Sequence, residues 1–393
     1  MSVVATALAV VAAGVWLAVR VHAHRAGTGP VHSGLFALDA VLLVLIFGAQ
    51  DEAVWGRWMR EDGWAEWGTA YAFGGAAVLW AVHAKRSTGL PRLAAILLGL
   101  FCVFVAGEEL SWGQRVLAFQ PPETFLEQNF QQEANLHNVL QNHSVGGFKL
   151  DSRFLVALFC VGFGVLGPGV ALAWRRRGGT ELPAPAIALL PYFGWIASVE
   201  LVYPVHLAGE AAELGLGLVL LVDGVMRLVW SPRHVNLAFG MPLVLGVLTP
   251  PVLDAVWFGS DDLRTAEAQA ELDALRAELV AGTTLDVNLL AKRGRVHKRM
   301  HSAAVSGYLK LPGRGEEAAA APSRQAYLLD PWNNPYWVLW VRDSGVLVLY
   351  SFGANRRRDI QSRPFGGAAG DDIVVALSTV GTPSAAPLPR DPD

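Results

Sequence analysis

The stretch LAAILLGLFCVFVAGEELSWGQR, residues 93–115, runs from an apolar segment directly into a polar motif. A helix of about 20 mainly apolar residues is long enough to cross a membrane, and the first part of this stretch has that character. Glu108 and Glu109 therefore stand where the chain is expected to leave the lipid. Two interpretations are open for this pair: an ordinary polar helix end, or part of a chemical site.

The composition of the whole chain favours a membrane protein. Of its 393 residues, 53% are hydrophobic and only 17% are charged, which is more apolar than an ordinary soluble domain. The net charge of −3 argues against a nucleic-acid partner. Cys102 and Cys160 both lie inside apolar runs, so a disulfide framework is excluded as the stabilising principle.

The apolar runs predict a polytopic α-helical membrane protein with about eight transmembrane helices. Pro191 and Pro204 interrupt the sixth run, where a kink or a re-entrant segment is possible. The predicted spans lie near residues 2–19, 34–50, 67–84, 92–109, 153–174, 184–205, 208–231 and 236–257.

The distribution of positive charge predicts the orientation. The loops after the first, third, fifth and seventh spans are rich in Arg and Lys, as in Arg175, Arg176 and Arg177, and contain almost no acids. Short loops with this excess stay in the cytoplasm. We therefore predict a multi-pass protein of the plasma (inner) membrane, surrounded by lipid, with extracytoplasmic N- and C-termini.

The composition changes after the last span, which divides the chain into a bundle (1–258), an extracytoplasmic α+β domain (259–378) and a disordered tail (379–393). Ala268, Leu272, Leu275 and Leu279 recur at helical spacing and predict an amphipathic helix. The runs YWVLWV and VLVLYSF, separated by RDSG, predict a β-hairpin.

Three segments of this domain carry a resemblance: LDPWNNPY (329–336), LYSFGAN (349–355) and GGAAGDDI (366–373). They resemble the globular domain of the major pseudopilin, protein G, of type II secretion systems. The resemblance covers roughly 260–376, under a third of the chain, and implies calcium binding and an envelope or secretion protein as partner. It assigns the entry turn to Asp330, Pro331, Trp332, Asn334, Pro335 and Tyr336, and the calcium ligands to Asn355, Asp371, Asp372 and the carbonyl of Phe352.

The residues themselves support part of this assignment. Asp330 and Asn334 can bind nearby backbone amides in a turn, and a glycine-rich loop with paired carboxylates offers the oxygen ligands that calcium prefers. However, Asn355 replaces the family's aspartate, and three arginines follow it. The alternative is a metal-free loop in which Asp371 or Asp372 pairs with an arginine. The chain also lacks the processing signal of a pilin that is cleaved and polymerised.

A second group of acids and histidines is predicted at the outer ends of the spans. Near 122–143 the loop resembles one amphipathic helix, whose apolar stripe would include Glu133 and His137 at i, i+4 spacing. His206 and Glu210 repeat that spacing, and Glu213 follows on the same run. The candidate ligands of a transition metal are Glu108, Glu109, Glu133, His137, Glu200, His206 and Glu210. The alternative is structural: hydrogen-bonded pairs that hold the loop on the bundle.

The segments GEELSWGQR (107–115) and NFQQEANLHN (129–138) also resemble a group of uncharacterised bacterial multispanning membrane proteins, for which the resemblance implies no activity. Two functions follow from the sequence. The favoured one is a non-enzymatic envelope protein that displays the pseudopilin-like, calcium-binding domain for protein interaction or secretion-related assembly. The alternative is a membrane-embedded, metal-dependent hydrolase or transferase that uses the outer-face cluster. A transporter is a weaker third reading.

Overall fold

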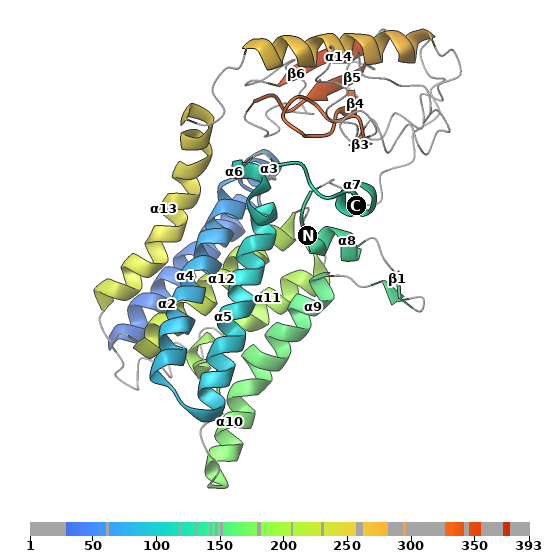
Figure 1. The fold of residues 1–393 in the computed structure, drawn as a ribbon. Coiled ribbons are helices and arrows are strands. Elements are labelled where there is room, and N and C mark those ends of the chain that lie inside the picture. Colours follow the sequence, from blue (N-terminus) through green and yellow to red (C-terminus); the bar gives the residue numbers. More distant parts are fainter. Residues whose placement is uncertain are drawn as a thin grey trace. The chain divides into compact units, whose positions relative to one another are not determined.

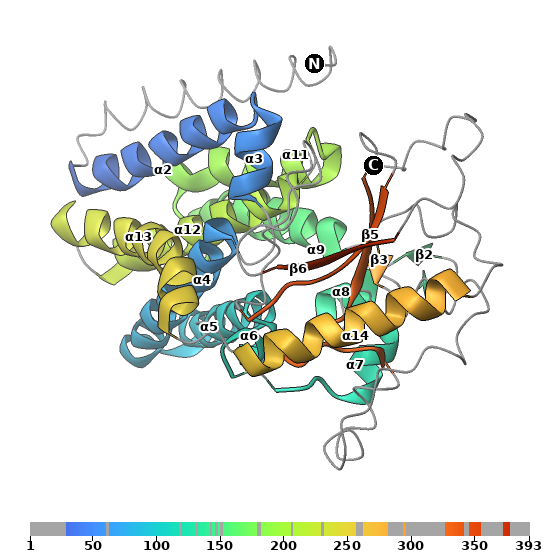
Figure 2. The same cartoon turned by 90° about the horizontal axis from the view of Figure 1, so that it is seen from above.

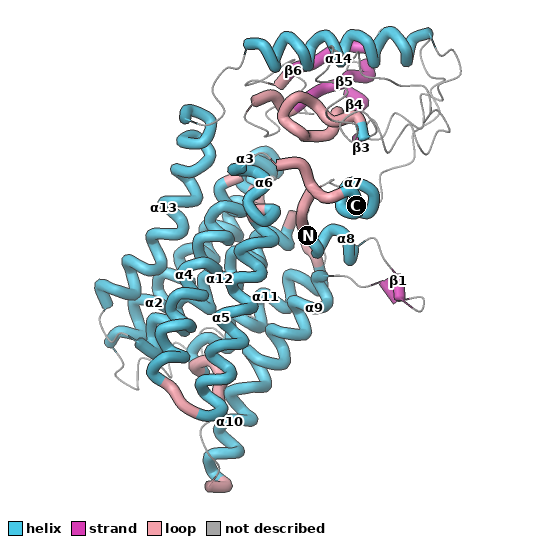
Figure 3. Tube along the Cα trace, viewed as in Figure 1, coloured by secondary structure: helices cyan, strands magenta, loops and turns pink. Residues whose placement is uncertain are grey.

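The structure is a computed structural model, and its described part is mainly helical with a small antiparallel sheet (Figures 1 and 3). The chain divides into two compact units, Met1–Trp112 with Asn135–Pro251 and Gly113–Ala134 with Val252–Asp393. The described residues are 29–59, 63–117, 119–129, 133–141, 144–145, 148–149, 152–178, 182–205, 207–228, 232–256, 262–281, 294–295, 327–341, 346–354 and 372–377.

The first unit is a helical bundle. Residues 152–176 form one long apolar helix with a π-helical middle, Cys160–Leu166. The other helices end at prolines, glycines or short polar loops. The helices are α2 (Gly29–Gly48), α3 (Glu52–Trp58), α4 (Trp64–Arg86), α5 (Gly89–Glu109), α8 (Leu136–Gln141), α9 (Ser152–Phe159), α10 (Gly167–Arg176), α11 (Leu190–Val202), α12 (Ala208–Leu228) and α13 (Pro232–Val256), with a short strand pair of β1 (Ser144–Val145) and β2 (Phe148–Lys149).

Helix α12 lies at the centre of this bundle, where it packs against α2, α4 and α11, and α4 packs against α5 (Figure 1). Small residues allow the close approach: a Cβ atom on Gly217 would meet the Ala72 and Phe73 side chains at 3.0 Å. Most of α12 is buried. Helix α12 is therefore surrounded by α2, α4 and α11.

Several outer helices expose apolar side chains instead of burying them. Among the described helices, α5 and the long helix Ser152–Arg176 are long and apolar enough to cross a membrane. The exposed side chains include Leu93, Leu97, Leu100 and Val103 on α5 and Phe154, Leu158, Leu166 and Val170 on the long helix.

Most of the described chain that coincides with a predicted span is helical. Seven of the eight segments, those from 34–50 to 236–257, fall on α2, α4, α5, the helix of 152–176, α11, α12 and α13. The first segment, 2–19, lies outside the described residues. The positions of these helices were therefore predictable from the sequence, whereas their number as membrane spans is not established by the fold.

The second unit contains a four-stranded sheet of order β3–β4–β5–β6, formed by Gly294–Arg295, Trp337–Val341, Val346–Ser351 and Ile373–Leu377. All neighbouring strands are antiparallel. Helix α14 (Asp262–Ala281) lies beside β5 and β6 (Figure 2). This unit also includes the short helices α6 (Gln114–Leu117) and α7 (Glu123–Gln128).

Two predictions for this unit are confirmed. The hairpin forms from β4 and β5, with Val338 opposite Leu349. The amphipathic helix forms as α14, whose Ala268, Leu272 and Leu275 are fully buried in a core with the sheet. Alternating strand residues supply that core with Val338, Leu347, Leu349 and Val375, because successive side chains of a strand point to opposite faces.

Candidate functional site

Three carboxylates of the bundle converge where α5 ends and α12 begins. Glu109 is the last residue of α5, and Glu210 and Glu213 lie in the first turns of α12. Since residues three apart share one face of a helix, Glu210 and Glu213 both reach Glu109. One carboxylate oxygen of each residue lies within 4.8 Å of the corresponding oxygens of the other two.

The surroundings of Glu109 are acidic. Its side chain is only 9% exposed, and no hydrogen bond joins its carboxylate to a residue that the structure describes. The charged groups that act most strongly on it are the carboxylates of Glu213, Glu210, Glu66 and Glu108. Buried like charges repel strongly at this range, so the cluster requires either bound protons or a cation.

The three residues of the cluster offer only carboxylate oxygens, and this ligand type determines which cation suits it. Carboxylate oxygens favour Mg²⁺, Ca²⁺ or Mn²⁺, whereas zinc sites in proteins are usually built with histidine or cysteine. His137 is the described imidazole that interacts electrostatically with Glu213. The arrangement can therefore hold a hard divalent cation with a base nearby.

Glu108 has a different role from its neighbour Glu109. Its carboxylate accepts hydrogen bonds from the Trp112 indole Nε1 at 2.6 Å and from the backbone N–H groups of Leu136 at 2.6 Å and His137 at 2.8 Å. The His137 Nδ1 lies 3.5 Å from the same carboxylate. Glu108 thus binds the first N–H groups of α8, which have no partner within the helix.

The two sequence motifs support each other through further hydrogen bonds. In the bundle, the Asn135 side-chain amide donates to the Ser111 hydroxyl at 3.4 Å. In the second unit, the backbone N–H of Ala134 donates to the Gln114 side chain at 2.8 Å, and the Asn129 side-chain amide donates to the Glu133 carbonyl at 2.6 Å. Residues of the motif GEELSWGQR therefore bind Ala134, Asn135, Leu136 and His137.

Backbone strain marks the same motif. Ser111, Trp112 and Gly113 all have positive φ, of 44°, 53° and 87°. A non-glycine residue in this left-handed region costs roughly 1–2 kcal/mol. The bonds from Trp112 to Glu108 and from Asn135 to Ser111 stabilise a turn that these residues do not favour by themselves.

The prediction of one helix near 122–143 is wrong. The structure forms two short helices, Glu123–Gln128 and Leu136–Gln141, and Glu133 lies in neither. The first helix is followed by Asn129, whose side-chain amide donates to the Glu133 carbonyl. The Glu108 carboxylate accepts the N–H of Leu136, the first residue of the second helix. Glu133 and His137 therefore do not share one helical stripe.

The other predicted ligands of the outer-face cluster have mixed outcomes. The structure brings Glu109 and Glu210 together, and it adds Glu213, which the sequence had placed nearby without nominating it. Its signal was the i, i+3 spacing from Glu210. Glu200 is buried in α11 but is not one of the three converging carboxylates. His206 lies outside the described residues.

No family model, curated protein or solved structure matches this chain. The resemblance to the major pseudopilin and to the group of multispanning proteins therefore rests on the motifs alone.

The predicted entry turn of the second unit is centred on Asp330. One oxygen of this fully buried carboxylate accepts the backbone N–H groups of Trp332 at 3.0 Å and Asn334 at 2.8 Å, and the other accepts the Ser351 hydroxyl at 2.6 Å. Tyr336 is buried and donates its hydroxyl to Glu271 of α14. The turn therefore ties the start of β4 to the end of β5 and to the helix.

The predicted calcium ligands are described only in part. Asn355 and Asp371 lie outside the described residues. Phe352 and Asp372 are both buried. Phe352 comes directly after Ser351 and Asp372 directly before its partner Ile373, so both stand at the same end of β5 and β6. The Phe352 ring packs on Trp337, with ring centroids 5.5 Å apart. These two candidates therefore lie at the same edge of the sheet.

One contact ties the loop helix α7 to the sheet of the same unit. The Tyr327 hydroxyl donates to the carboxylates of Glu127 at 3.1 Å and Glu123 at 3.3 Å. Leu126, Tyr327 and Leu329 form a small buried cluster. Burial and the hydrogen bond to Glu127 raise the pKa of Tyr327 to about 12, because both favour the neutral phenol.

Proposed function

We propose that the protein is a multi-pass plasma-membrane protein with eight spans and both termini extracytoplasmic. The apolar side chains that α5 and the long helix Ser152–Arg176 expose support contact with lipid. The excess of Arg and Lys in alternate loops supports the orientation. On this orientation Glu109, Glu210 and Glu213 lie at the extracytoplasmic end of the bundle.

The function that the geometry supports best is a membrane-embedded, metal-dependent hydrolase or transferase acting on an envelope or lipid substrate. The observation that carries this proposal is the convergence of the buried Glu109 with the partly buried Glu210 and Glu213, whose carboxylate oxygens lie within 4.8 Å of one another. Membrane-depth acids are rare, because they are costly, and usually serve a function. A divalent cation there would activate a water molecule or polarise the substrate.

The chain supplies the remaining parts of such a site. Glu109, Glu210 and Glu213 would hold the cation by their oxygens, and His137, which interacts electrostatically with Glu213, would take the proton of the attacking water. Glu108 positions His137 through the bond to its backbone N–H. The hydroxide would then add to the acyl or phosphoryl centre, the bond from that centre to the leaving group would break, and His137 would return its proton to the leaving group.

The test is manganese binding to the purified full-length protein, followed by electron paramagnetic resonance. We expect Glu109→Gln and Glu213→Gln to lose bound Mn²⁺, because each removes a charged ligand. Glu133→Gln is the matched control and should bind as the wild type does. Equal Mn²⁺ binding by all four proteins would contradict the cation site.

The chemistry has a separate test. Wild-type protein with Mn²⁺ should release p-nitrophenol from p-nitrophenyl phosphate or p-nitrophenyl acetate, and Glu109→Gln should not. Cation binding without cation-dependent release from either probe argues against a hydrolase and leaves the cation a structural role.

The second candidate function is display of the sheet unit for an envelope or secretion protein, with calcium bound in its loop. The observation that favours it is the position of Phe352 and Asp372 at one sheet edge beside the Asp330 turn. Calcium retention by wild type and its loss in Asp371→Ala/Asp372→Ala would support this function. Unchanged calcium retention in the double variant would exclude the loop as a calcium site.

A further inference from the structure

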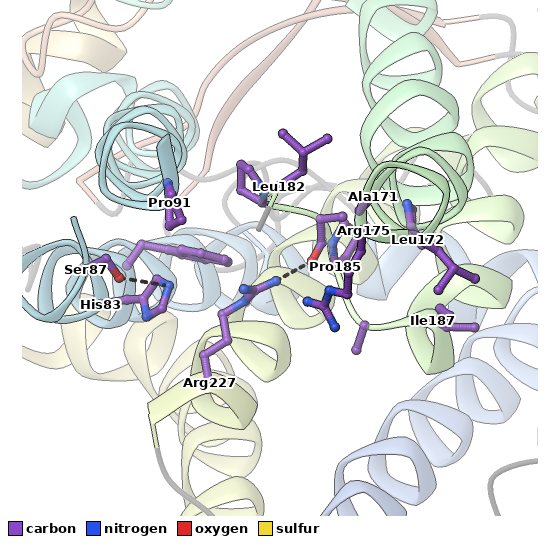
Figure 4. A pocket seen from close by; sticks show the side chains of 15 residues that line it. His83, Ser87, Pro91, Ala171, Leu172, Arg175, Leu182, Pro185, Ile187 and Arg227 are labelled. Atoms are coloured by element: carbon purple, nitrogen blue, oxygen red, sulfur yellow. Dashed lines mark hydrogen bonds between the residues drawn. The ribbon is translucent and has the colours of Figure 1, made fainter. Parts of the chain in front are cut away.

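A cavity of about 300 Å³ (Figure 4) lies at the opposite end of the bundle from the carboxylate cluster, as the helices that line it show. Pro91 near the start of α5 and Arg227 near the end of α12 both line it. Glu109 and Glu210 occupy the other ends of the same two helices. The cavity is therefore separate from the proposed metal site.

The polar groups that line the cavity are cationic or hydrogen-bonding. Arg175 enters from α10 and Arg227 from α12, while His83 and Ser87 come from the end of α4 (Figure 4). The described lining contains no Asp or Glu. A cavity with two guanidinium groups and no lining carboxylate favours an anionic ligand.

Arg227 is held in a fixed position. Its Nε donates to Asp223 at 3.2 Å, one terminal nitrogen donates to the Ala184 carbonyl, and its guanidinium lies 5.1 Å from the centre of the Trp80 ring. These contacts occupy only part of its five N–H donors. Asp223 balances its charge, and Arg175 brings a second guanidinium to the same cavity.

The donors approach from several helices, which suits a tetrahedral anion with several acceptor oxygens. Guanidinium groups bind phosphate oxygens in pairs, and the Ser87 hydroxyl and the His83 imidazole, which are hydrogen-bonded to each other at 3.4 Å, add a further donor. Leu172 and Ile187 line the same cavity and are 42% and 54% exposed. An apolar tail attached to the anion would lie along these side chains.

We propose that this cavity binds a phosphate group, between Arg175 and Arg227, carried by either a phospholipid or a soluble phosphate compound. The exposed Leu172 and Ile187 fit the lipid source, and the hydrogen-bonding groups fit both. The proposal does not depend on the metal site at the other end of α5 and α12.

The test uses purified full-length protein and two probes, phosphatidylglycerol by native mass spectrometry and inorganic phosphate by calorimetry. Phosphatidylcholine is the lipid control. Arg175→Ala removes one guanidinium, and Arg176→Ala is its matched control, because Arg176 is the exposed neighbour in the same turn but does not line the cavity. Arg227→Lys keeps the charge beside Asp223 but removes the planar fork.

We expect Arg175→Ala to weaken binding of the phosphate probe about tenfold, because a charge-assisted pair is lost, and Arg176→Ala to leave it unchanged. Arg227→Lys should weaken it as well, and its melting temperature is measured alongside, because the guanidinium also binds Asp223 and the Ala184 carbonyl. Dependence on Arg175 with phosphatidylglycerol alone identifies a lipid headgroup, and dependence with inorganic phosphate identifies a soluble ligand. Equal binding by Arg175→Ala and Arg176→Ala, or no preference for phosphatidylglycerol over phosphatidylcholine together with no phosphate binding, would overturn the proposal.

Discussion

Asp330 in the second unit and Glu109 in the bundle are both buried carboxylates, but their surroundings differ. Asp330 accepts two backbone N–H groups and one hydroxyl. Glu109 is surrounded by other carboxylates and accepts no hydrogen bond from a described residue. A buried carboxylate with donors stabilises its fold, whereas one among like charges costs free energy unless a cation joins it.

Asp330→Ala should have the largest effect, because it leaves two buried N–H groups and the Ser351 hydroxyl without their acceptor. We expect the free energy of local unfolding to fall by about 3 kcal/mol or more. Hydrogen exchange of residues 327–341 and 346–354 measures this opening. Asp273→Ala is the control, since Asp273 is exposed on α14 and accepts a hydrogen bond from the Gln269 side chain, and its effect should stay within about 0.5 kcal/mol.

Glu109→Gln should have the opposite effect on the metal-free protein, because it removes one of several like charges. Mn²⁺ at 100 times its Kd should stabilise the wild type by about 2.7 kcal/mol, and this gain should vanish in the variant. Melting temperatures with and without Mn²⁺ measure both effects. If the variant is less stable than the metal-free wild type and is still stabilised by Mn²⁺, then Glu109 stabilises the fold, as Asp330 does, and is not a cation ligand.

Glu108→Ala sharpens the comparison between adjacent residues. The change leaves the N–H groups of Leu136, His137 and the Trp112 indole without an acceptor, and we expect a loss of about 2 kcal/mol in the free energy of unfolding. Mn²⁺ binding should persist, because Glu108 is not one of the three converging carboxylates. Loss of Mn²⁺ binding with unchanged stability would show that Glu108 is a cation ligand and not a structural hydrogen-bond acceptor.

Tyr327→Phe should have the smallest effect. It removes the hydrogen bonds to Glu123 and Glu127 but keeps the packing on Leu126 and Leu329. We expect a loss of about 1 kcal/mol, measured by hydrogen exchange of α7. Tyr327→Ala is the comparison and should cost more, because it also removes the buried ring. Equal effects of both substitutions would assign the stability to the hydroxyl alone.

The sequence predicted those features that depend on short-range patterns. Apolar runs located α2, α4, α5, the helix of 152–176, α11, α12 and α13, and the runs YWVLWV and VLVLYSF on either side of RDSG located the β4–β5 hairpin. The turn at Asp330 was predictable because its acceptors and donors lie within four residues. Glu109 and Glu210 were predictable as neighbours because both stand at helix ends assigned to one side of the membrane.

The sequence failed where contacts join distant residues. The break between α7 and α8 depends on Glu108 and Gln114, which bind backbone groups more than 19 residues later. Local periodicity carries no information on such bonds, so 122–143 looked like a single helix. Glu213 was not nominated as a ligand: its i, i+3 spacing from Glu210 was visible in the sequence, but its approach to Glu109, 104 residues earlier, was not.

The contact between α7 and Tyr327 has a consequence for how the protein is made. Glu123 leaves the ribosome 204 residues before Tyr327, its partner in the same unit. The segment Gly113–Ala134 is therefore made before Asn135–Pro251 of the bundle, and it can complete its own unit only when the part from Val252 onward has been synthesised. A chain cut between α13 and α14 would separate Leu126 from Tyr327 and Leu329, and neither fragment would contain a complete second unit.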